Sequence, residues 1–562
     1  MTMAAPARSG TLRFGLDRLD VGRFAVGAWL TDRAWLIRAA ALVWVACTSA
    51  CTTLPPGADY PRVASAAFNE PSQTRLGQAF VEAARQHDGE SGFRLVPVGL
   101  DGFALRMQLI QSAERALDLQ YYIFHGDNTG SLLTAAILDS ADRGVHVRLL
   151  IDDGETIAGD ERVLALVAHP RIEVRVFNPF RYRGHLDVLR GLEYSLDFAR
   201  LDYRMHNKLL LADGAMAVIG GRNLSDPYFQ VNPDAQFADD DVVAVGPVVP
   251  ELASVFDEFW NSALAIPSEA LSGGRSTATD LERFRGQIAA NRRAWNEQGA
   301  DYLRRAGTGA LLAGLLDGHL PLEWSRASLI YDSPDKRKVS EGAMVGRLMH
   351  RAVAGAAEAV SSELIMVTPY LIPGQEGMRI FSDLRKRGVR VRILTNSLEA
   401  SAMMLAQAGY MRYRSALVAE GVELYEVRSL LGDARGSGEN ASMAKHGNYG
   451  LHAKMFVFDR REIFIGSMNF DQRSMHLNTE IGLLIDNKAL AGQIAARFDA
   501  MVRPDNAYAL ALRPSTDGSA PSLVWRTREA GADVEYDTEP QRVWGQRWMA
   551  HLLSWLPIDS EL

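Results

Sequence analysis

The chain has 562 residues, of which 47% are hydrophobic and 23% charged. This composition is typical of globular proteins and excludes collagen-like, low-complexity and disordered classes. Its 60 basic and 68 acidic residues give a formal net charge of −8, which argues against a nucleic-acid-binding protein because such proteins need a cationic surface. The two cysteines are Cys47 and Cys51. The rest of the chain therefore holds no disulfide, thiol nucleophile or cysteine-ligated metal.

The first 51 residues have the features of an export signal. Arg33 and Arg38 precede an apolar run over 39–47, which is too short to span a hydrocarbon core of about 30 Å. Small residues precede Cys51, as in bacterial lipoprotein signals, in which the cysteine is lipidated. We therefore expect a signal over 1–51, lipidation of Cys51 and a position at a bacterial membrane, with the leaflet left open. The alternatives are an uncleaved interfacial anchor and a misassigned start codon.

The remainder contains an internal repeat with a period of about 246 residues, the spacing between His206 and His452. Each copy has a strand, a helical stretch and two further strands, over 117–124, 131–143, 144–150 and 172–176 in the first copy and 364–372, 378–387, 388–394 and 422–427 in the second. This order predicts βαβ units with parallel strands. The expected fold class is therefore α/β, with two similar halves.

The repeat and the composition divide the chain into six segments. We expect a signal (1–51), a helical lead-in (52–91), a first half (92–265), a linker with covering helices (266–345), a second half (346–503) and a C-terminal extension (504–562). The extension carries Trp544, Trp548, Leu552 and Trp555 at helical spacing. Such a stripe is more often part of a core, and a membrane-interface face is the alternative.

Each copy contains the pattern His-x-Lys-x4-Asp followed by an asparagine. The residues are His206, Lys208, Asp213 and Asn223 in the first copy and His452, Lys454, Asp459 and Asn469 in the second. Alternate residues of a strand point to the same side, so the histidine and lysine of each motif face one way. Two copies facing each other would place two imidazoles, two ammonium groups and two carboxamides around one pocket.

This set of groups suits attack on a phosphodiester. Lysine and asparagine stabilise charge on the non-bridging oxygens, one imidazole can attack phosphorus, and the other can transfer protons. The lysines supply positive charge, so we expect no metal and no cofactor. Each histidine also needs an acid to hold its tautomer. Glu480, 28 residues after His452, is placed for this role, and Asp241 begins the matching strand of the first copy.

These motifs, with Gly220-Gly221-Arg222-Asn223 and Gly466-Ser467-Met468-Asn469, resemble the phospholipase D superfamily. The similarity runs from about Gly92 to the C-terminus and is greatest to the bacterial cardiolipin synthase branch. It implies two phospholipase D-like α/β sandwich halves with the active site at their interface.

The resemblance also implies roles for individual residues. One of His206 and His452 forms a phosphohistidine, with His206 favoured, and the other is the general acid and base. Lys208, Lys454, Asn223 and Asn469 bind the phosphate, and Asp213 and Asp459 mainly support the hairpins. One departure is Gly221 where the second copy has Ser467, which removes one hydroxyl contact to the phosphate.

The leading functional hypothesis is transfer of a phosphatidyl group to form cardiolipin from phosphatidylglycerol, with phosphatidylethanolamine as a second donor. The alternative is hydrolysis that releases phosphatidic acid, which would use every one of the same catalytic residues. The expected partners are therefore phospholipids and a membrane surface. Cleavage of DNA is disfavoured by the net negative charge, and a non-catalytic scaffold is disfavoured because both motifs are intact.

Overall fold

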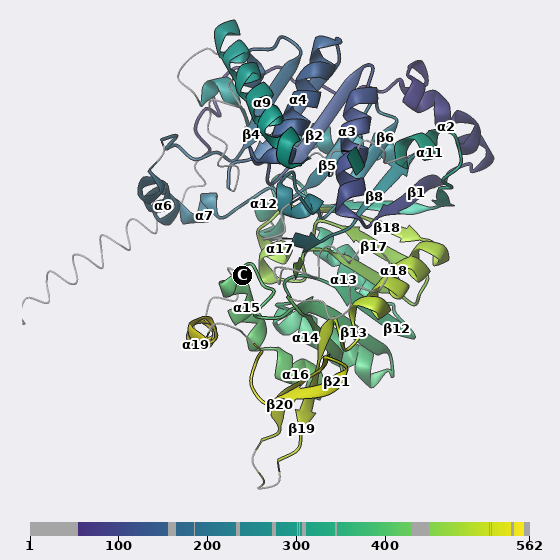
Figure 1. The fold of residues 1–562 in the computed structure, drawn as a ribbon, viewed down its shortest axis with the longest axis vertical. Helices are drawn as coiled ribbons and strands as arrows, with labels where there is room; N and C mark the ends of the chain where they lie inside the picture. Colours follow the sequence, from purple (N-terminus) through teal and green to yellow (C-terminus); the bar gives the residue numbers. More distant parts are fainter. Residues whose placement is uncertain are drawn as a thin grey trace, which may run out of the picture. The chain divides into compact units, whose positions relative to one another are not determined.

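Two large β-sheets, one in each half of the repeat, organise the structure (Figure 1). The computed structural model describes residues 54–154, 165–184, 186–231, 236–271, 277–299, 302, 304–305, 311–342, 346–429, 449–515, 518, 520–540 and 544–555. Residues Leu54–Leu562 form one unit, and Met1–Thr53 are assigned to another. The expected signal and Cys51 lie outside the described residues.

The first sheet has nine strands in the order β10-β1-β8-β6-β5-β2-β3-β4-β9. Their bounds are β1 Ser91–Val96, β2 Ala116–Tyr121, β3 His146–Asp152, β4 Ile172–Phe177, β5 Lys208–Ala212, β6 Met216–Gly220, β8 Asp241–Val245, β9 Ala265–Pro267 and β10 Glu323–Ser325. Strands β2, β3 and β4 are parallel, as the βαβ pattern predicts.

The second sheet has ten strands in the order β11-β18-β17-β16-β12-β13-β14-β19-β20-β21. Their bounds are β11 Ala327–Tyr331, β12 Glu363–Val367, β13 Arg390–Asn396, β14 Glu423–Val427, β16 Met455–Phe458, β17 Glu462–Gly466, β18 Ile481–Asp486, β19 Ala507–Arg513, β20 Ser522–Glu529 and β21 Ala532–Tyr536. Strands β12, β13 and β14 are parallel.

The two strand orders correspond over eight positions. The run β1-β8-β6-β5-β2-β3-β4-β9 matches β11-β18-β17-β16-β12-β13-β14-β19 in order and direction. The predicted α/β class with two similar halves is therefore confirmed. Strand β11 lies within the range 266–345 that we expected to link the halves, and β19 lies within the expected extension. Each pairs antiparallel with a strand of the second half, β11 with β18 and β19 with β14, and a single short apolar run of this kind carries no βαβ signal.

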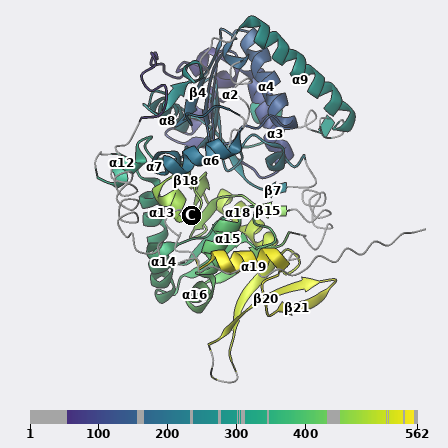
Figure 2. The same cartoon turned by 90° about the vertical axis from the view of Figure 1, so that its left-hand side faces the viewer.

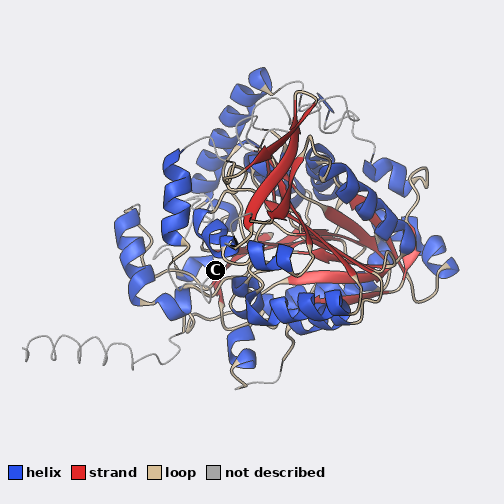
Figure 3. Cartoon of the chain, turned by 90° about the horizontal axis from the view of Figure 1, so that it is seen from below, coloured by secondary structure: helices blue, strands red, loops and turns tan. Residues whose placement is uncertain are grey.

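Helices flank both sheets (Figure 3). Those associated with the first half are α2 Arg75–Gln86, α3 Gly99–Ser112, α4 Asn128–Asp142, α6 Asp187–Leu196, α7 Phe198–Leu201, α8 Val248–Trp260, α9 Ala278–Gln298 and α11 Leu311–Leu316. The remaining helices are α12 Lys336–Ser340, α13 Met349–Glu358, α14 Gly374–Lys386, α15 Met404–Met411, α16 Arg414–Ala419, α17 Gln472–His476, α18 Lys488–Met501 and α19 Trp544–Leu553.

One apolar core is shared by both halves. Ile219 and Val242 of the first sheet and Ile465 and Leu483 of the second belong to the same buried cluster, together with side chains of α8 and α18. Neighbouring strand residues such as Val218 point to the opposite face, into a separate core with α3 and α4, because successive side chains of a strand alternate. The shared core fixes the position of one half against the other.

Candidate active site

Both histidines lie where a segment of one half pairs with a segment of the other. The backbone N–H of His206 donates to the carbonyl of Thr479 at 2.9 Å, and that of His452 donates to the carbonyl of Ala238 at 2.8 Å. A two-stranded parallel sheet of β7 (Gln236–Ala238) and β15 (Tyr449–Leu451) leads into the second contact. The two motifs therefore meet at the interface between the halves.

Each imidazole receives a carboxylate from the opposite half. Nδ1 of His206 lies 2.9 Å from Oε2 of Glu480, and Nδ1 of His452 lies 2.6 Å from Oδ2 of Asp239. Both carboxylates are fully buried, and each histidine is 7% exposed. A carboxylate at Nδ1 holds the proton on that nitrogen and leaves the lone pair of Nε2 for chemistry.

We expected Asp241 to be the acid that holds a histidine, and this prediction is wrong. The acid is Asp239, two residues earlier. Gly220 pairs with Asp241 across β6 and β8, and Gly466 pairs with Gly482 across β17 and β18. This register makes Asp239, and not Asp241, the counterpart of Glu480. The carboxylate of Asp241 instead accepts from the guanidinium groups of Arg106 at 2.8 Å and Arg222 at 3.1 Å.

The pairing of acids with histidines also differs from the sequence pattern. The pattern placed each acid with the histidine of its own copy, whereas the structure exchanges them between the halves. The spacing of residues along the chain cannot reveal this exchange, because the exchange depends on how the two halves dock.

The lysines are buried beside the histidines. Nζ of Lys208 donates to the carbonyl of His206 at 2.6 Å, and Nζ of Lys454 lies 2.9 Å from Nδ1 of His452. Burial lowers the pKa of Lys208 well below its usual value and lowers the pKa of Lys454 to about 8. Ammonium groups in a site of low dielectric attract a phosphate strongly, and a bound phosphate in turn favours the charged form of each lysine.

The two histidine–acid pairs have different electrostatics. Burial and the adjacent lysines hold the pKa of His206 well below its usual value and lower that of His452 to about 3. Burial raises the pKa of Glu480 to about 7. Burial opposes ionisation of Asp239 as well, but His452 and Lys454 hold the pKa of this carboxyl at about 2. Asp239 is therefore the more firmly ionised partner.

The difference between Gly221 and Ser467 follows from these carboxylates. The hydroxyl of Ser467 donates to Oε2 of Glu480 at 2.5 Å, so it supports the acid and is not directed at a phosphate as we expected. A Cβ at Gly221 would lie 2.1 Å from Oδ1 of Asp239. Glycine is required in the first copy because the carboxylate of Asp239 occupies that space.

The motif aspartates lie at the far ends of the strands, away from the histidines. The carboxylate of Asp213 accepts from the backbone N–H groups of residues 114–116, and that of Asp459 accepts from those of 361–363. Each ties a hairpin to the start of the neighbouring strand, β2 or β12, which runs antiparallel to it. This geometry supports the structural role expected for both residues.

The asparagines lie in the two loops that follow β6 and β17. Oδ1 of Asn223 accepts from the N–H of Ile123 at 3.2 Å, and its amide donates to the hydroxyl of Tyr228 at 2.9 Å. Oδ1 of Asn469 is buried and has no partner within the described chain.

Two tyrosines that the sequence patterns did not single out as site residues also contact the imidazoles. Tyr122 packs edge-on against His206, with ring centroids 5.1 Å apart, and Tyr228 packs edge-on against His452 at 4.9 Å.

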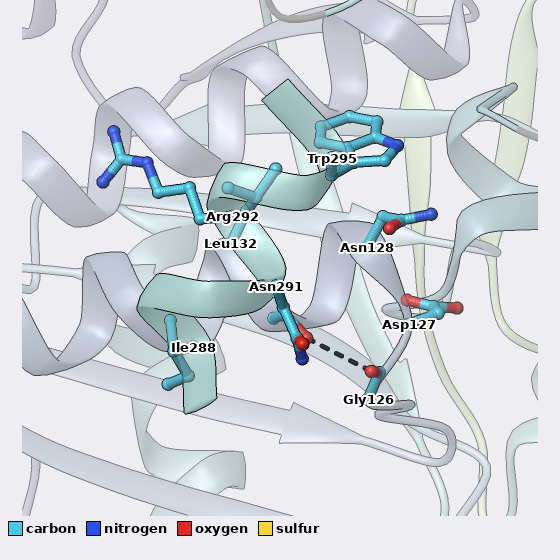
Figure 4. A pocket seen from close by; sticks show the side chains of 9 residues that line it. Gly126, Asp127, Asn128, Leu132, Ile288, Asn291, Arg292 and Trp295 are labelled. Atoms are coloured by element: carbon cyan, nitrogen blue, oxygen red, sulfur yellow. Dashed lines mark hydrogen bonds between the residues drawn. The ribbon is translucent and has the colours of Figure 1, made fainter. Parts of the chain in front are cut away.

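No cluster of three or more His, Cys, Asp or Glu side chains that could hold a metal occurs among the described residues. A cavity of about 140 Å³ lies between the start of α4 and α9, lined by Asp127, Asn128, Leu132, Arg292 and Trp295 among others (Figure 4). None of the motif residues lines this cavity, so it does not extend the histidine site.

A family model described as "Cardiolipin synthase, PLD-like domain" matches residues 107–260 and 355–502, one match in each half. The chain therefore belongs to the phospholipase D superfamily, in its cardiolipin synthase-like branch, and is an enzyme of this type.

The chain is also similar to individual proteins over most of its length. Cardiolipin synthase C of Escherichia coli strain K12 is 36% identical over 491 residues, covering 86% of this chain and 99% of the relative. An uncharacterised protein of Helicobacter pylori strain 26695 is 29% identical over 431 residues, covering 76% of this chain and 82% of the relative. A crystal structure of a phosphatidylserine synthase from Haemophilus influenzae aligns with a TM-score of 0.49 at 14% identity, covering 76% of this chain and 91% of that one.

Within the described chain, no helix combines the length and apolar character needed to cross a membrane. Lipidation of Cys51 remains a prediction, as does the export signal. In the C-terminal extension, Trp548, Leu552 and Trp555 are exposed to solvent, so the interpretation of this stripe as part of a core is wrong for these three residues.

Proposed function

We propose that this enzyme is a phosphatidyltransferase that forms cardiolipin from phosphatidylglycerol through a phosphohistidine intermediate. The observation that carries the proposal is the pair of buried imidazoles, each held by a carboxylate from the opposite half, with two lysines between the halves. The names of the relatives, cardiolipin synthases C and A among them, point to the same reaction.

In the first step, Nε2 of His206 attacks the phosphorus of phosphatidylglycerol. The bond from phosphorus to the headgroup glycerol oxygen breaks, and His452 gives a proton to that oxygen so that glycerol leaves. Lys208 and Lys454 stabilise the charge on the non-bridging oxygens. An anionic phosphate between these lysines offsets their charge and so raises the pKa of His452 into the range of a general acid.

In the second step, a headgroup hydroxyl of another phosphatidylglycerol enters. His452 removes the proton of this hydroxyl, its oxygen attacks phosphorus, and the bond from Nε2 of His206 to phosphorus breaks. The products are cardiolipin and the free, neutral imidazole. Phosphatidylethanolamine would act as a second donor in the same way, with ethanolamine leaving in place of glycerol.

The difference between the two acids supports these roles. Asp239, held ionised 2.6 Å from His452, stabilises an imidazolium and suits the acid–base residue. Glu480 already accepts hydrogen bonds from Ser467 and Ser474, so it offers less negative charge to His206. A neutral imidazole is the nucleophilic form, and His206 is the residue better suited to remain neutral.

The assignment is tested by trapping the intermediate. In the His452→Ala variant, incubated with phosphatidylglycerol carrying an activated leaving group, we expect an acid-labile phosphatidyl adduct on the peptide containing His206. The His206→Ala variant is the matched control and should form none. An adduct on His452 in the control would reverse the two roles.

A further inference from the structure

Helix α6 presents its apolar side to solvent. Val188, Leu192 and Leu196 follow one stripe at intervals of four residues, and they are 82%, 53% and 80% exposed. Between Val188 and Ala199 every exposed residue is uncharged, and α6 has no buried residue. An amphipathic helix of a globular protein ordinarily turns this stripe toward the core.

The charged side of α6 is the side that contacts the protein. Arg190 lies 4.1 Å over the ring of Phe180 and donates to the carbonyl of Asp153. The carboxylate of Glu193 accepts from the backbone N–H groups of Arg181 and Tyr182 at 2.6 and 2.8 Å. The orientation of α6 is therefore fixed by specific polar contacts that keep its apolar stripe outside.

The second half carries exposed apolar side chains of the same kind. Met403 and Leu405 are exposed at the start of α15, and Trp548, Leu552 and Trp555 are exposed on and just after α19. Arg412, after α15, donates to the carbonyl of Ser554 at 2.8 Å, which joins α19 to α15. Figure 2 shows α6, α15 and α19 on the side that faces the viewer, and Figure 1 shows them along its left-hand edge.

These helices belong to the end of the sheets at which the histidines lie. Helix α6 follows the carboxyl end of β4, and α15 follows that of β13. The hydroxyl of Tyr194 on α6 donates to Asp202 at 2.6 Å, and Asp202 also accepts from Arg473 at 2.5 Å. Arg473 precedes Ser474, whose hydroxyl donates to Glu480. The exposed stripe of α6 is thus connected to the acid that holds His206.

We propose that α6, together with the exposed ends of α15 and α19, is the surface with which this enzyme docks on a phospholipid bilayer. The inference rests on the proposed phospholipid substrate, whose headgroup must reach buried histidines while its acyl chains stay in the membrane. A surface of leucine, valine, methionine and tryptophan, with an exposed charge on α6 only at Asp187, its first residue, suits the boundary between headgroups and acyl chains. An apolar stripe exposed along a whole helix is typical of an interaction site.

The first test measures whether lipid vesicles protect the backbone of α6 itself. Hydrogen–deuterium exchange of the full chain is measured with and without vesicles of equal parts phosphatidylglycerol and phosphatidylethanolamine. We expect the amides of 187–198 to exchange more slowly with vesicles, while those around Val63, an exposed apolar residue beside β4 whose carbonyl accepts from Arg175, do not change. Unchanged exchange across 187–198 would overturn the proposal.

The second test uses Leu192→Asp with Leu196→Asp, and Val63→Asp as the matched control. The double variant replaces two exposed leucines by charged side chains that the lipid interface does not accept. We therefore expect vesicle binding and cardiolipin formation from vesicles to fall about tenfold or more. Activity on short-chain phosphatidylglycerol dispersed below its micelle concentration should stay within about twofold, because docking is not needed there. The control should behave as the wild type in every assay.

The outcomes separate this proposal from the proposed function. If the wild type forms cardiolipin and the double variant still binds vesicles normally, the docking surface is wrong and the function stands. If the wild type forms no cardiolipin but vesicles still protect 187–198, the function is wrong and the docking surface stands. A variant that changes from dimer to monomer with unchanged vesicle binding would assign α6 to a contact between two copies and overturn the proposal.

Discussion

At the scale of single residues, the two histidines are alike in sequence but differ in their acids. His452 has the shorter, firmly ionised Asp239, and His206 has Glu480, whose charge is shared with two hydroxyls. The glycine at position 221 follows from the same difference in acids, because the carboxylate of Asp239 fills the space that a side chain would occupy there. The difference between the two acids thus explains the glycine at position 221 and supports the proposed division of chemical roles.

Asp239→Asn should abolish most activity without unfolding the enzyme. An amide cannot stabilise the imidazolium of His452, and loss of general acid–base catalysis costs about 100- to 10,000-fold in kcat. The matched control is Asp241→Asn, two residues away, which leaves Arg106 and Arg222 partly unpaired in the interior. Breaking such a buried pair costs about 3–5 kcal/mol, so the control should lower Tm and the yield of folded protein. Full activity of folded Asp239→Asn would contradict the assignment.

A plot of kcat/KM against pH should be bell-shaped. Below its pKa of about 7, Glu480 takes up a proton and no longer accepts the Nδ1–H of His206. Above its pKa of about 8, Lys454 loses the charge that binds the phosphate. Activity should therefore be highest between about pH 7 and 8. Lys454→Arg keeps its charge, so its alkaline limb should move up by about one pH unit or more. An unmoved alkaline limb would exclude Lys454 as its source.

At the scale of elements, the short helix α12 supports the site from the segment between the halves. Nζ of Lys336 contacts Asp332 at 2.8 Å and the carbonyls of Ser474 and Asn478 at 2.6 and 2.7 Å. Asp332 in turn accepts from the backbone N–H of Glu480 at 3.1 Å. The ion pair is fully buried, and it holds the backbone of Glu480, the acid of His206, directly before β18.

Lys336→Met should destabilise the enzyme by about 3–5 kcal/mol, because it leaves the carboxylate of Asp332 buried without its cation. Lys338→Met, two residues on, removes a partly exposed cation that pairs with Asp335 at 2.8 Å, and it should cost about 1 kcal/mol or less. Urea unfolding of the two variants checks the difference. Equal stability would show that α12 does not support the site.

At the scale of the whole molecule, the halves share both a core and an active site. The cluster containing Ile219 and Leu483 continues from one sheet to the other, and each histidine depends on an acid from the opposite half. Calorimetry of the full chain should therefore show one unfolding transition for residues 54–562. Two separated transitions, with one half unfolding first, would contradict this coupling.

Much of this arrangement could be predicted from the sequence. The βαβ patterns and the repeated histidine–lysine motifs are local, and they correctly indicated two α/β halves. The acid of His452 could not be found in the same way, because Asp239, Asp240 and Asp241 are adjacent and only strand register separates them. The inverted orientation of α6 was also hidden, since its apolar period is that of an ordinary buried helix.

The most direct test of the proposed reaction is to identify the product that purified enzyme forms from labelled phosphatidylglycerol, with and without phosphatidylethanolamine. We predict cardiolipin and free glycerol, with none in the His206→Ala and His452→Ala variants, and an increase with phosphatidylethanolamine if it is a second donor. Phosphatidic acid as the only lipid product would show that water, and not a lipid hydroxyl, resolves the intermediate, and would contradict the assignment as a transferase.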